Sequence, residues 1–175
     1  MTPRLSSAAT YRPAVDADRD VMRAFVAQDL ATTPYGVVVE YFLHLANDGA
    51  GANESRAIVA DRAGTVVGFV LFGEVAGTIG TGRVHFVSVT SSARLDGVGT
   101  GLCEAAVADL RSNDARLVVA EVPDEPSFVA GRTLLDRCGF AEIGRVADYF
   151  RDNTDLVVLA RTIPGDTPTA GVDRA

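Results

Sequence analysis

The sequence predicts an α/β fold with a mixed sheet of about seven strands, in the order βααβββαβαββ. Two segments near the start carry apolar residues at helical spacing, whereas the middle and the end carry β-branched runs bounded by turn residues. A third observation is the order strand, helix, strand across residues 84–122, which favours a parallel crossover in the middle of the sheet. The strands before this crossover are joined by short turns, which favours antiparallel pairing there.

The first half of the chain predicts a short strand, two helices, a flexible loop and three strands. These elements are expected as a strand at 11–15, a helix reaching Leu30, a helix from Pro34 past Leu45, a loop at 49–53, a hairpin at 56–77 turning at 62–64, and a strand ending at Val89. Asp16 or Asp18 is expected to cap the first helix and Thr33 the second, because short polar side chains accept hydrogen bonds from the free N–H groups of a first turn.

The second half predicts a helix, a strand, a helix and two final strands. The apolar residues of the first of these helices recur every four positions: Val98, Leu102, Ala106 and Leu110. The strand at 115–122 is stopped by Pro123, and the next helix closes at Gly139, which suits a left-handed C-terminal turn. The final strands are expected around 143–150 and 156–161.

Length and composition indicate one globular domain. With 175 residues and a hydrophobic share of 47%, the chain can bury a core without disulfides or metals. Because neither a repeat nor a linker interrupts the pattern, residues 1–163 are expected to form a single domain. The polar, turn-rich residues 164–175 are expected to be a disordered tail.

Charge and hydropathy argue against several classes of partner. The net charge of −7 argues against nucleic acid, since no stripe of Lys and Arg is available to neutralise phosphates. No apolar run approaches the roughly 20 residues of a spanning helix, and the start lacks the apolar segment of a signal peptide. Cys103 and Cys138 lie in apolar segments without metal-ligand spacing, which indicates buried free thiols of a reducing compartment. We therefore expect a cytoplasmic protein with no metal, membrane or nucleic-acid partner.

The most informative stretch covers residues 84–110, where a β-branched run leads into three alternating glycines at the mouth of a helix: Gly97, Gly99 and Gly101. A helix N-terminus presents unpaired N–H groups and a partial positive charge, which together bind phosphate. Glycines let a diphosphate approach the backbone closely. Arg94 at the entrance can add charge-assisted hydrogen bonds. The local chemistry predicts a pyrophosphate cradle.

Three phosphate-binding patterns compete for this stretch. A nucleotide P-loop needs a Lys-Ser or Lys-Thr pair, which is absent. A dinucleotide fingerprint needs a third glycine where Leu102 stands, although Glu121 falls about 20 residues further on, as that motif requires. Its glycines also arrive more than 90 residues into the chain, too late for a Rossmann sheet. The third pattern, [Q/R]-x-x-G-x-[G/A], fits residues 94–99. The alternative to all three is that the glycines only permit tight packing of helix on strand.

On this motif and its context the sequence resembles the GNAT superfamily of acyl-CoA-dependent N-acyltransferases. The motif follows a strand, opens a helix, and is trailed by "VVAEV" and by a helix ending in "LLDRCGF". The closing "DYFRDNTDLVVLAR" is similar to the final hairpin of that superfamily. The resemblance covers roughly residues 11–161.

The resemblance implies acetyl-CoA as co-substrate and a splay between the two central parallel strands. It implies that the pantetheine amides pair with the backbone of Val87, Ser88 and Val89. It also implies that the pyrophosphate is held by the amides of the loop and first turn: Leu95, Asp96, Gly97, Val98, Gly99, Thr100 and Gly101. Asp96 departs from the family pattern, which usually has a basic residue there, and its carboxylate repels a diphosphate unless it points to solvent.

Acyl transfer to an amine needs a base, because an alkylamine is only about 0.1% neutral at pH 7. Glu121 resembles a strand glutamate used as base in the branch that acetylates protein N-termini, although the Arg and Asn expected after it are absent. Its alternative role is a strand-end carboxylate facing solvent. His85 is a second candidate, with a hydrogen-bonded core residue as the alternative. His44 lies on a helix beside the apolar stripe, and we expect it to pack or to face solvent.

The general acid is missing from its usual position. Many relatives place a tyrosine four residues before the helix-ending glycine, where this chain has Leu135. Tyr149 in the last hairpin is the nearest replacement; it could equally line the acceptor pocket or cover the core. Alternatively, the thiolate leaves unaided, which its pKa near 8.5 permits.

The leading hypothesis is an N-acetyltransferase in which a primary amine directly attacks acetyl-CoA. The alternative is a non-catalytic acyl-CoA-binding or sensor module, motivated by Leu135 and Asp96. The expected partner is a small-molecule or peptide amine, with small amines, amino acids, antibiotics and protein termini all open as acceptors. The resemblance also implies a possible homodimer.

Overall fold

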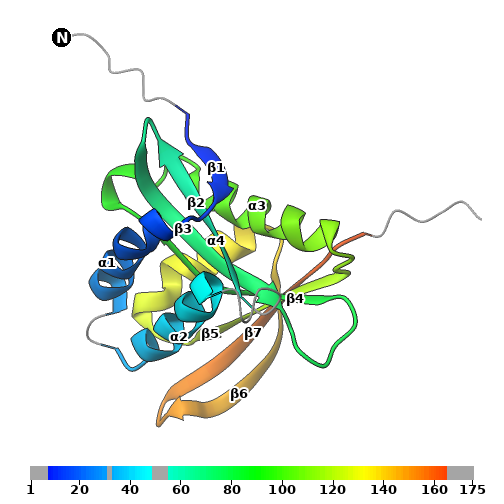
Figure 1. Cartoon of the computed structure of the whole chain (residues 1–175). Helices are drawn as coiled ribbons and strands as arrows, with labels where there is room; N and C mark the ends of the chain where they lie inside the picture. Colours follow the sequence, from blue (N-terminus) through cyan, green and yellow to red (C-terminus); the bar gives the residue numbers. More distant parts are fainter. Residues whose placement is uncertain (1–7, 31–32, 49–54, 165–175) are drawn as a thin grey trace, which may run out of the picture.

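A computed structural model describes residues 8–30, 33–48 and 55–164, which form seven strands and four α-helices (Figure 1). The strands are β1 (Thr10–Pro13), β2 (Arg56–Arg62), β3 (Thr65–Glu74), β4 (Thr81–Val89), β5 (Leu117–Pro123), β6 (Ala141–Arg151) and β7 (Thr154–Thr162). The helices are α1 (Arg19–Leu30), α2 (Tyr35–Asp48), α3 (Val98–Ser112) and α4 (Val129–Arg137), with short 3₁₀ turns at Asp16–Asp18, Ser91–Ala93 and Pro126–Phe128. The predicted element order is confirmed. The loop predicted at 49–53, and the predicted tail from residue 165 on, lie outside the described residues.

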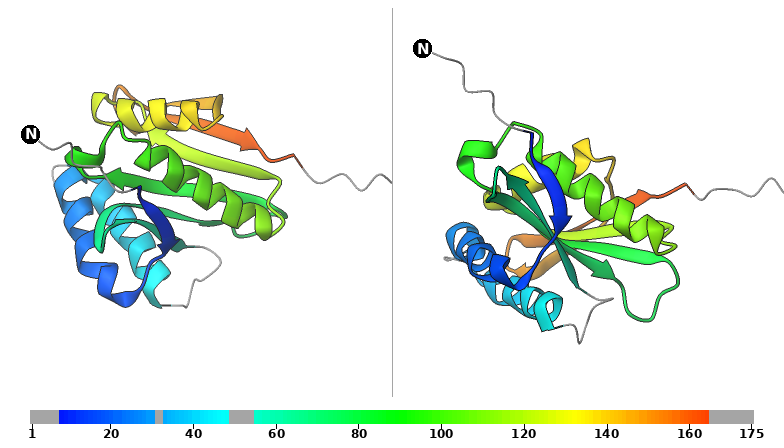
Figure 2. Two further views of the ribbon diagram at one scale, coloured as in Figure 1. Left: turned by 90° about the horizontal axis from the view of Figure 1, so that it is seen from above. Right: turned by 45° about the horizontal axis from the view of Figure 1, so that its top comes forward.

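The seven strands form one mixed sheet in the order β1-β2-β3-β4-β5-β7-β6. Every neighbouring pair is antiparallel except β4 and β5, which are parallel, as the strand–helix–strand order predicts. Helices α1 and α2 lie on one side of the sheet and α3 on the other (Figure 2). We call these sides the α1/α2 face and the α3/α4 face.

Each face of the sheet has its own hydrophobic cluster. On the α3/α4 face, the four residues predicted for the buried stripe of α3 are at most 2% exposed: Val98, Leu102, Ala106 and Leu110. On the α1/α2 face, Met22, Phe25 and Leu43 pack against Phe69 and Leu71 of β3. Burying one such side chain contributes about 1.5–3 kcal/mol, so the helices are held by these stripes rather than by helix propensity.

The two parallel strands separate soon after they meet. β4 and β5, both described throughout, pair at three positions, from Thr81 with Leu117 to Arg83 with Val119. Beyond this point each strand stays with its antiparallel partner: β4 pairs with β3 up to Val89, and β5 pairs with β7 up to Pro123. A β-bulge interrupts the β3–β4 ladder between Val84 and Phe86, and such bulges bend a strand. We call residues 84–89 and 120–123 and the gap between them the splay.

The caps of the first two helices differ from the prediction. Thr33 does not cap α2, because its hydroxyl donates to the carbonyl of Leu30 at the end of α1 (3.1 Å), and α2 begins at Tyr35. Asp18 lies in the turn before α1, where its carboxylate accepts a hydrogen bond from the N–H of Val15 (2.9 Å). Within the described ranges, no helix combines the length and the apolar character that crossing a membrane requires.

Asp18 is also a structural anchor, and its removal is expected to destabilise the fold. The side chain of Arg12 donates to both of its carboxylate oxygens (2.7 and 3.0 Å), and this bond holds the pKa of Asp18 below its usual value against the opposing effect of burial. Asp18→Asn should therefore lower the free energy of unfolding by about 2 kcal/mol at pH 7. Because the pKa of Asp18 is lowered in the folded protein, its ionised carboxylate stabilises the fold above about pH 4. This stabilisation is lost as the pH falls below about 4 toward the pKa of the folded state.

Urea unfolding followed by circular dichroism at pH 7 and pH 3 tests this expectation. The difference between wild type and Asp18→Asn should shrink at pH 3. Asp16→Asn is the matched control, because the Asp16 side chain is 92% exposed. Equal losses in the two variants would contradict the anchoring role of Asp18.

Candidate active site

The three glycines at the start of α3 have different structural roles. Gly97 is the N-cap residue and has a φ of +81°, a left-handed conformation that side chains disfavour. A Cβ on Gly99 would lie 3.1 Å from a δ-carbon of Leu134 in α4, and a Cβ on Gly101 would overlap the Tyr11 hydroxyl of β1. The first glycine thus shapes the turn, and the other two let α4 and β1 approach the helix.

The first turn of α3 contains a short run of backbone amides without an acceptor in the helix. The N–H of Gly101 already donates to the carbonyl of Gly97 (2.9 Å), which closes the first helical turn. The amides of Val98, Gly99 and Thr100 precede this bond and therefore have no acceptor within the helix. Leu95, also left-handed with a φ of +70°, is 95% exposed. Among the residues predicted to form the anion cradle, those at 98–100 thus have amides without an acceptor in the helix.

Arg94 is held by the end of β4 and by α1. Its Nε donates to the carbonyl of Val89 (3.0 Å), and its Nη2 lies 3.4 Å from the carboxylate of Asp29. The same carboxylate accepts a hydrogen bond from the hydroxyl of Ser88 (2.6 Å). Asp29 therefore links α1 to the end of β4 and to the start of the glycine loop.

The backbone of β4 presents alternate residues to the splay. The N–H of Thr90, just after β4, donates to the carbonyl of Val67 in β3 (2.9 Å), which makes this a hydrogen-bonded antiparallel pair. Such pairs alternate along a ladder, so Ser88 also turns its N–H and C=O toward β3. Val87 and Val89 turn theirs toward the splay, and the contact of Arg94 with the Val89 carbonyl agrees with this direction. Of the three predicted residues, Val87 and Val89 offer backbone groups to a ligand in the splay.

Asp96 faces a basic residue from another part of the sheet. Its carboxylate lies 3.2 Å from Nη1 of Arg62, the last residue of β2, which is 34 positions away in the sequence. The cradle therefore contains two arginine–aspartate pairs, Arg94 with Asp29 and Arg62 with Asp96.

Glu121 and His85 occupy matching positions on the two sides of the splay. Each lies two residues beyond the last paired position of its strand, Arg83 on β4 and Val119 on β5. The Glu121 carboxylate lies 2.9 Å from Nη2 of Arg83, and its side chain is 38% exposed. The ring of His85 stacks on Phe42 of α2 with their centroids 3.7 Å apart. The Glu121 carboxylate is thus partly accessible to solvent, as a general base must be. His85 instead packs α2 against β4.

Tyr149 belongs to an aromatic group at the far end of β5. Its ring, 58% exposed, packs edge-on against Phe150, which in turn packs edge-on against Tyr35 at the start of α2. Tyr35 also packs edge-on against Phe128, and its hydroxyl donates to Glu125 (2.6 Å). Tyr149 is thus part of an aromatic cluster formed by α2, the β5–α4 connection and the β6–β7 hairpin.

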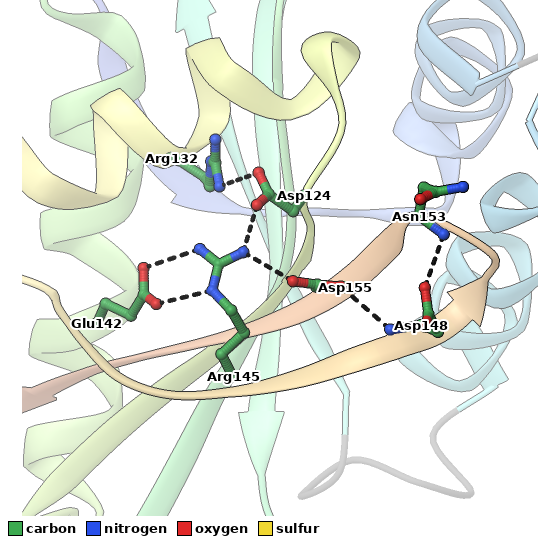
Figure 3. A network of polar contacts seen from close by, with 7 residues as sticks. All are labelled: Asp124, Arg132, Glu142, Arg145, Asp148, Asn153 and Asp155. Atoms are coloured by element: carbon green, nitrogen blue, oxygen red, sulfur yellow. Dashed lines mark hydrogen bonds and ion pairs between the residues drawn. The ribbon is translucent and has the colours of Figure 1, made fainter.

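A polar network holds this hairpin in place (Figure 3). Arg145 of β6 stands at its centre and contacts the carboxylates of Asp124, Asp155 and Glu142. Asp124 also accepts from Arg132 of α4 (2.5 Å), and the hydrogen bond from Arg145 holds the pKa of Asp124 below its usual value. The network joins the β5–α4 connection, α4, β6 and β7, and so fixes the segment that carries Tyr149.

The position of the missing tyrosine is part of the core. Leu135 is 6% exposed and packs in the cluster of the α3/α4 face. Cys103 and Cys138 are free and buried in the same cluster, as predicted. A hydrogen bond between the two thiols and burial raise the pKa of Cys103, so that this thiol stays protonated. None of these three residues offers a proton to the splay.

Tyr35 is expected to make stability depend on pH in the alkaline range. Burial, and after it the hydrogen bond to Glu125, raises the pKa of Tyr35 from 10.0 to about 12. Because the folded protein holds this proton more tightly, the free energy of unfolding should fall as pH rises from 10 to about 12. Tyr35→Phe should lose about 1 kcal/mol at pH 7 and show a flatter decline above pH 10. Urea unfolding at pH 8 and pH 11 measures both effects, and equal slopes for the two proteins would contradict this role of Tyr35.

Sequence reasoning missed the charged partners of the site. Arg83, Arg62 and Asp29 contact Glu121, Asp96 and Arg94, respectively. The Asp29–Ser88 bond joins positions 59 apart. No local spacing signals such a pair, because each depends on the register between strands and on how α1 packs on the sheet.

Comparisons with known proteins agree with this geometry. A family model described as "Acetyltransferase (GNAT) family" matches residues 23–140, a range that contains the glycine loop, the splay and α4. No curated protein matches the chain.

Solved structures of similar fold cover nearly the whole chain. A GNAT-family protein from Desulfovibrio desulfuricans superposes with a TM-score of 0.78 at 21% identity, over 89% of this chain and 99% of that chain. The yncA protein of Salmonella typhimurium, solved with its cofactor acetyl-CoA, gives 0.73 at 18% identity, over 93% and 98%. A ribosomal-protein-alanine N-acetyltransferase from Brucella melitensis gives 0.69 at 21% identity, over 88% and 99%. At these identities the likeness concerns the fold.

Proposed function

Because this chain belongs to the GNAT acetyltransferase family and is therefore an acetyl-CoA-dependent acyltransferase, we propose that it acetylates a primary amine by direct attack of the amine on the thioester. The observation that carries the proposal is the splay. β4 and β5 pair at three positions and then part, which leaves backbone groups of β4 and the carboxylate of Glu121 on the same opening.

The residues around the splay suit the chemical groups of acetyl-CoA. Pantetheine carries amides, which can add to a strand edge through the N–H and C=O groups of Val87 and Val89. A diphosphate suits the amides of residues 98–100 at the positive end of α3. Arg94, 55% exposed at the entrance of the loop, can add a charge-assisted hydrogen bond.

Glu121 is the base of the proposed reaction. The bound co-substrate supplies an acetyl thioester whose C–S bond breaks as the new C–N bond forms, giving the amide and the CoA thiolate. The Glu121 carboxylate accepts the proton of the attacking amine, directly or through one water molecule. Arg83 holds that carboxylate at the opening of the splay through its 2.9 Å contact.

The leaving group needs less help from the protein than the amine does. Because the pKa of a thiol is near 8.5, the CoA thiolate can depart without a strong general acid. This agrees with a buried leucine, Leu135, at the position where a tyrosine is usual. We therefore assign Tyr149 to the acceptor side of the site, together with Tyr35 and Phe150, and His85 to the packing of α2 on β4. The acceptor amine enters between this aromatic wall and Glu121.

The acceptor in the proposed reaction is an amine. The Brucella protein of similar fold is named for an alanine of a ribosomal protein. A peptide N-terminus is therefore one acceptor to test beside free amino acids and small amines. The buried free cysteines suit a reducing compartment and thus a cytoplasmic enzyme.

Titration calorimetry with acetyl-CoA, followed by thiol release with a panel of amines, tests the proposal. The expected result is binding of acetyl-CoA and release of free CoA only when an accepted amine is present. Binding without thiol release across small amines, amino acids and N-terminal peptides would favour the acyl-CoA sensor instead. Absence of binding would contradict both functions.

A further inference from the structure

Asp96 stands where the proposed phosphate-binding loop should be free of negative charge. It lies directly before Gly97, the N-cap residue whose following amides form the cradle. An unpaired carboxylate here would repel a diphosphate and would oppose the positive end of α3. The structure places the guanidinium of Arg62 on this carboxylate at 3.2 Å, so the charge is compensated from a distant part of the chain.

The backbone around Arg62 is fixed in a way that aims this side chain at the loop. A β-bulge interrupts the β2–β3 ladder between Ala60 and Asp61, and bulges redirect the side chains beside them. The neighbouring Asp61 accepts from the N–H of Gly64 (2.7 Å) and from Arg12 of β1 (3.3 Å), which fixes the hairpin turn. The backbone that carries Arg62 is therefore fixed by contacts that do not involve Asp96.

Arg62 has hydrogen-bond donors beyond those that contact Asp96. Its side chain is 19% exposed, whereas the Asp96 carboxylate is 48% exposed. The buried Nε of Arg62 has no hydrogen-bond partner among the residues that the structure describes. An exposed ion pair with one carboxylate adds little to the stability of the fold. A planar guanidinium can also bind two oxygens of a phosphate at once.

From this arrangement we infer that Arg62, paired with Asp96 beside the loop, is a phosphate-binding residue for the co-substrate. The inference rests on the proposed function, because acetyl-CoA is the ligand that brings phosphate groups to this loop. Arg62 contacts either the diphosphate or the 3′-phosphate of the coenzyme, and both have the same recognition chemistry. Together with Arg94 it gives the cradle a second cationic side chain, from the β2–β3 hairpin.

A double-substitution cycle separates binding from simple charge compensation. Arg62→Ala should raise the dissociation constant for CoA about tenfold, and Asp96→Asn should leave it equal or lower. If Arg62 only neutralised Asp96, the double variant Arg62→Ala/Asp96→Asn would bind as wild type does. We expect the double variant to remain weakened by about tenfold. Arg111→Ala, exposed about 20 Å away at the other end of α3, is the matched control and should bind normally.

The same titrations with truncated ligands identify the phosphate. With pantetheine, which has no phosphate, the effect of Arg62→Ala should vanish. With dephospho-CoA it should persist if Arg62 binds the diphosphate and vanish if Arg62 binds the 3′-phosphate. Restored binding in the double variant, or an equal loss with pantetheine, would overturn the inference while leaving the proposed function intact. If wild type fails to bind CoA at all, the proposed function itself is wrong and the role of Arg62 falls with it.

Discussion

Replacing Glu121 by glutamine is expected to lower kcat for acetyl transfer by about a hundredfold, with little change in the dissociation constant for acetyl-CoA. The amide keeps the size of the side chain but cannot take a proton, and a positioned general base contributes about 10²–10⁴-fold to a rate. The change removes no group that the co-substrate is proposed to contact. Steady-state kinetics with saturating amine, and calorimetry with acetyl-CoA, measure the two quantities separately.

Two further variants show whether the carboxylate itself is responsible. Arg83→Gln also breaks the ion pair of Glu121 but leaves the base in place, so its kcat should fall by less than tenfold. Glu104→Gln removes a comparable carboxylate, 47% exposed and paired with Arg161 at 2.7 Å on the outer surface of α3, and should keep the wild-type rate. A kcat for Glu121→Gln within threefold of wild type would exclude this residue as the base.

Gly99→Val is expected to weaken acetyl-CoA binding by between tenfold and a hundredfold. A Cβ alone would lie 3.1 and 3.3 Å from the two δ-carbons of Leu134, and the two further methyl groups of valine must displace α4 or the first turn of α3. Overpacking of this kind costs about 1–3 kcal/mol, and it moves the amides of residues 98–100 that form the cradle. Calorimetry gives the affinity, and urea unfolding gives the accompanying loss of stability.

Gly131→Val is the matched control for this substitution. Gly131 lies in α4, and a Cβ at this position has no heavy atom within 4 Å. The same valine should therefore leave binding unchanged and should not destabilise the helix, since valine has a higher helix propensity than glycine. Wild-type affinity in Gly99→Val would show that the start of α3 does not bind the co-substrate.

The fold was largely predictable because its signals are local. The fourfold repeat from Val98 to Leu110 predicts the buried stripe of α3, and the structure confirms all four positions. The predicted hairpin turn appears between β2 and β3. Local signals were less reliable for the caps, where Thr33 donates back to Leu30 because the chain turns sharply between α1 and α2.

The glycine loop shows where a motif stops being informative. The spacing of Gly97, Gly99 and Gly101 predicted a cradle, but three identical residues have three different structural reasons. One needs a left-handed φ, one makes room for Leu134, and one makes room for Tyr11. The sequence shows that Gly99 and Gly101 are glycines, but the residues that leave no room for a side chain there lie on α4 and β1.

The element order, the parallel crossover, the buried stripe of α3 and the loop that opens this helix could be predicted from the sequence, because they depend on hydrophobic period and on turn residues close along the chain. The polar contacts of the site depend on the tertiary structure: Arg83 with Glu121, Arg62 with Asp96, and Asp29 with both Arg94 and Ser88. Such pairs form between elements whose separation is set by strand register, bulges and helix packing. Coulomb attraction acts over a few ångströms of space whatever the distance along the chain, so no spacing in the sequence records it.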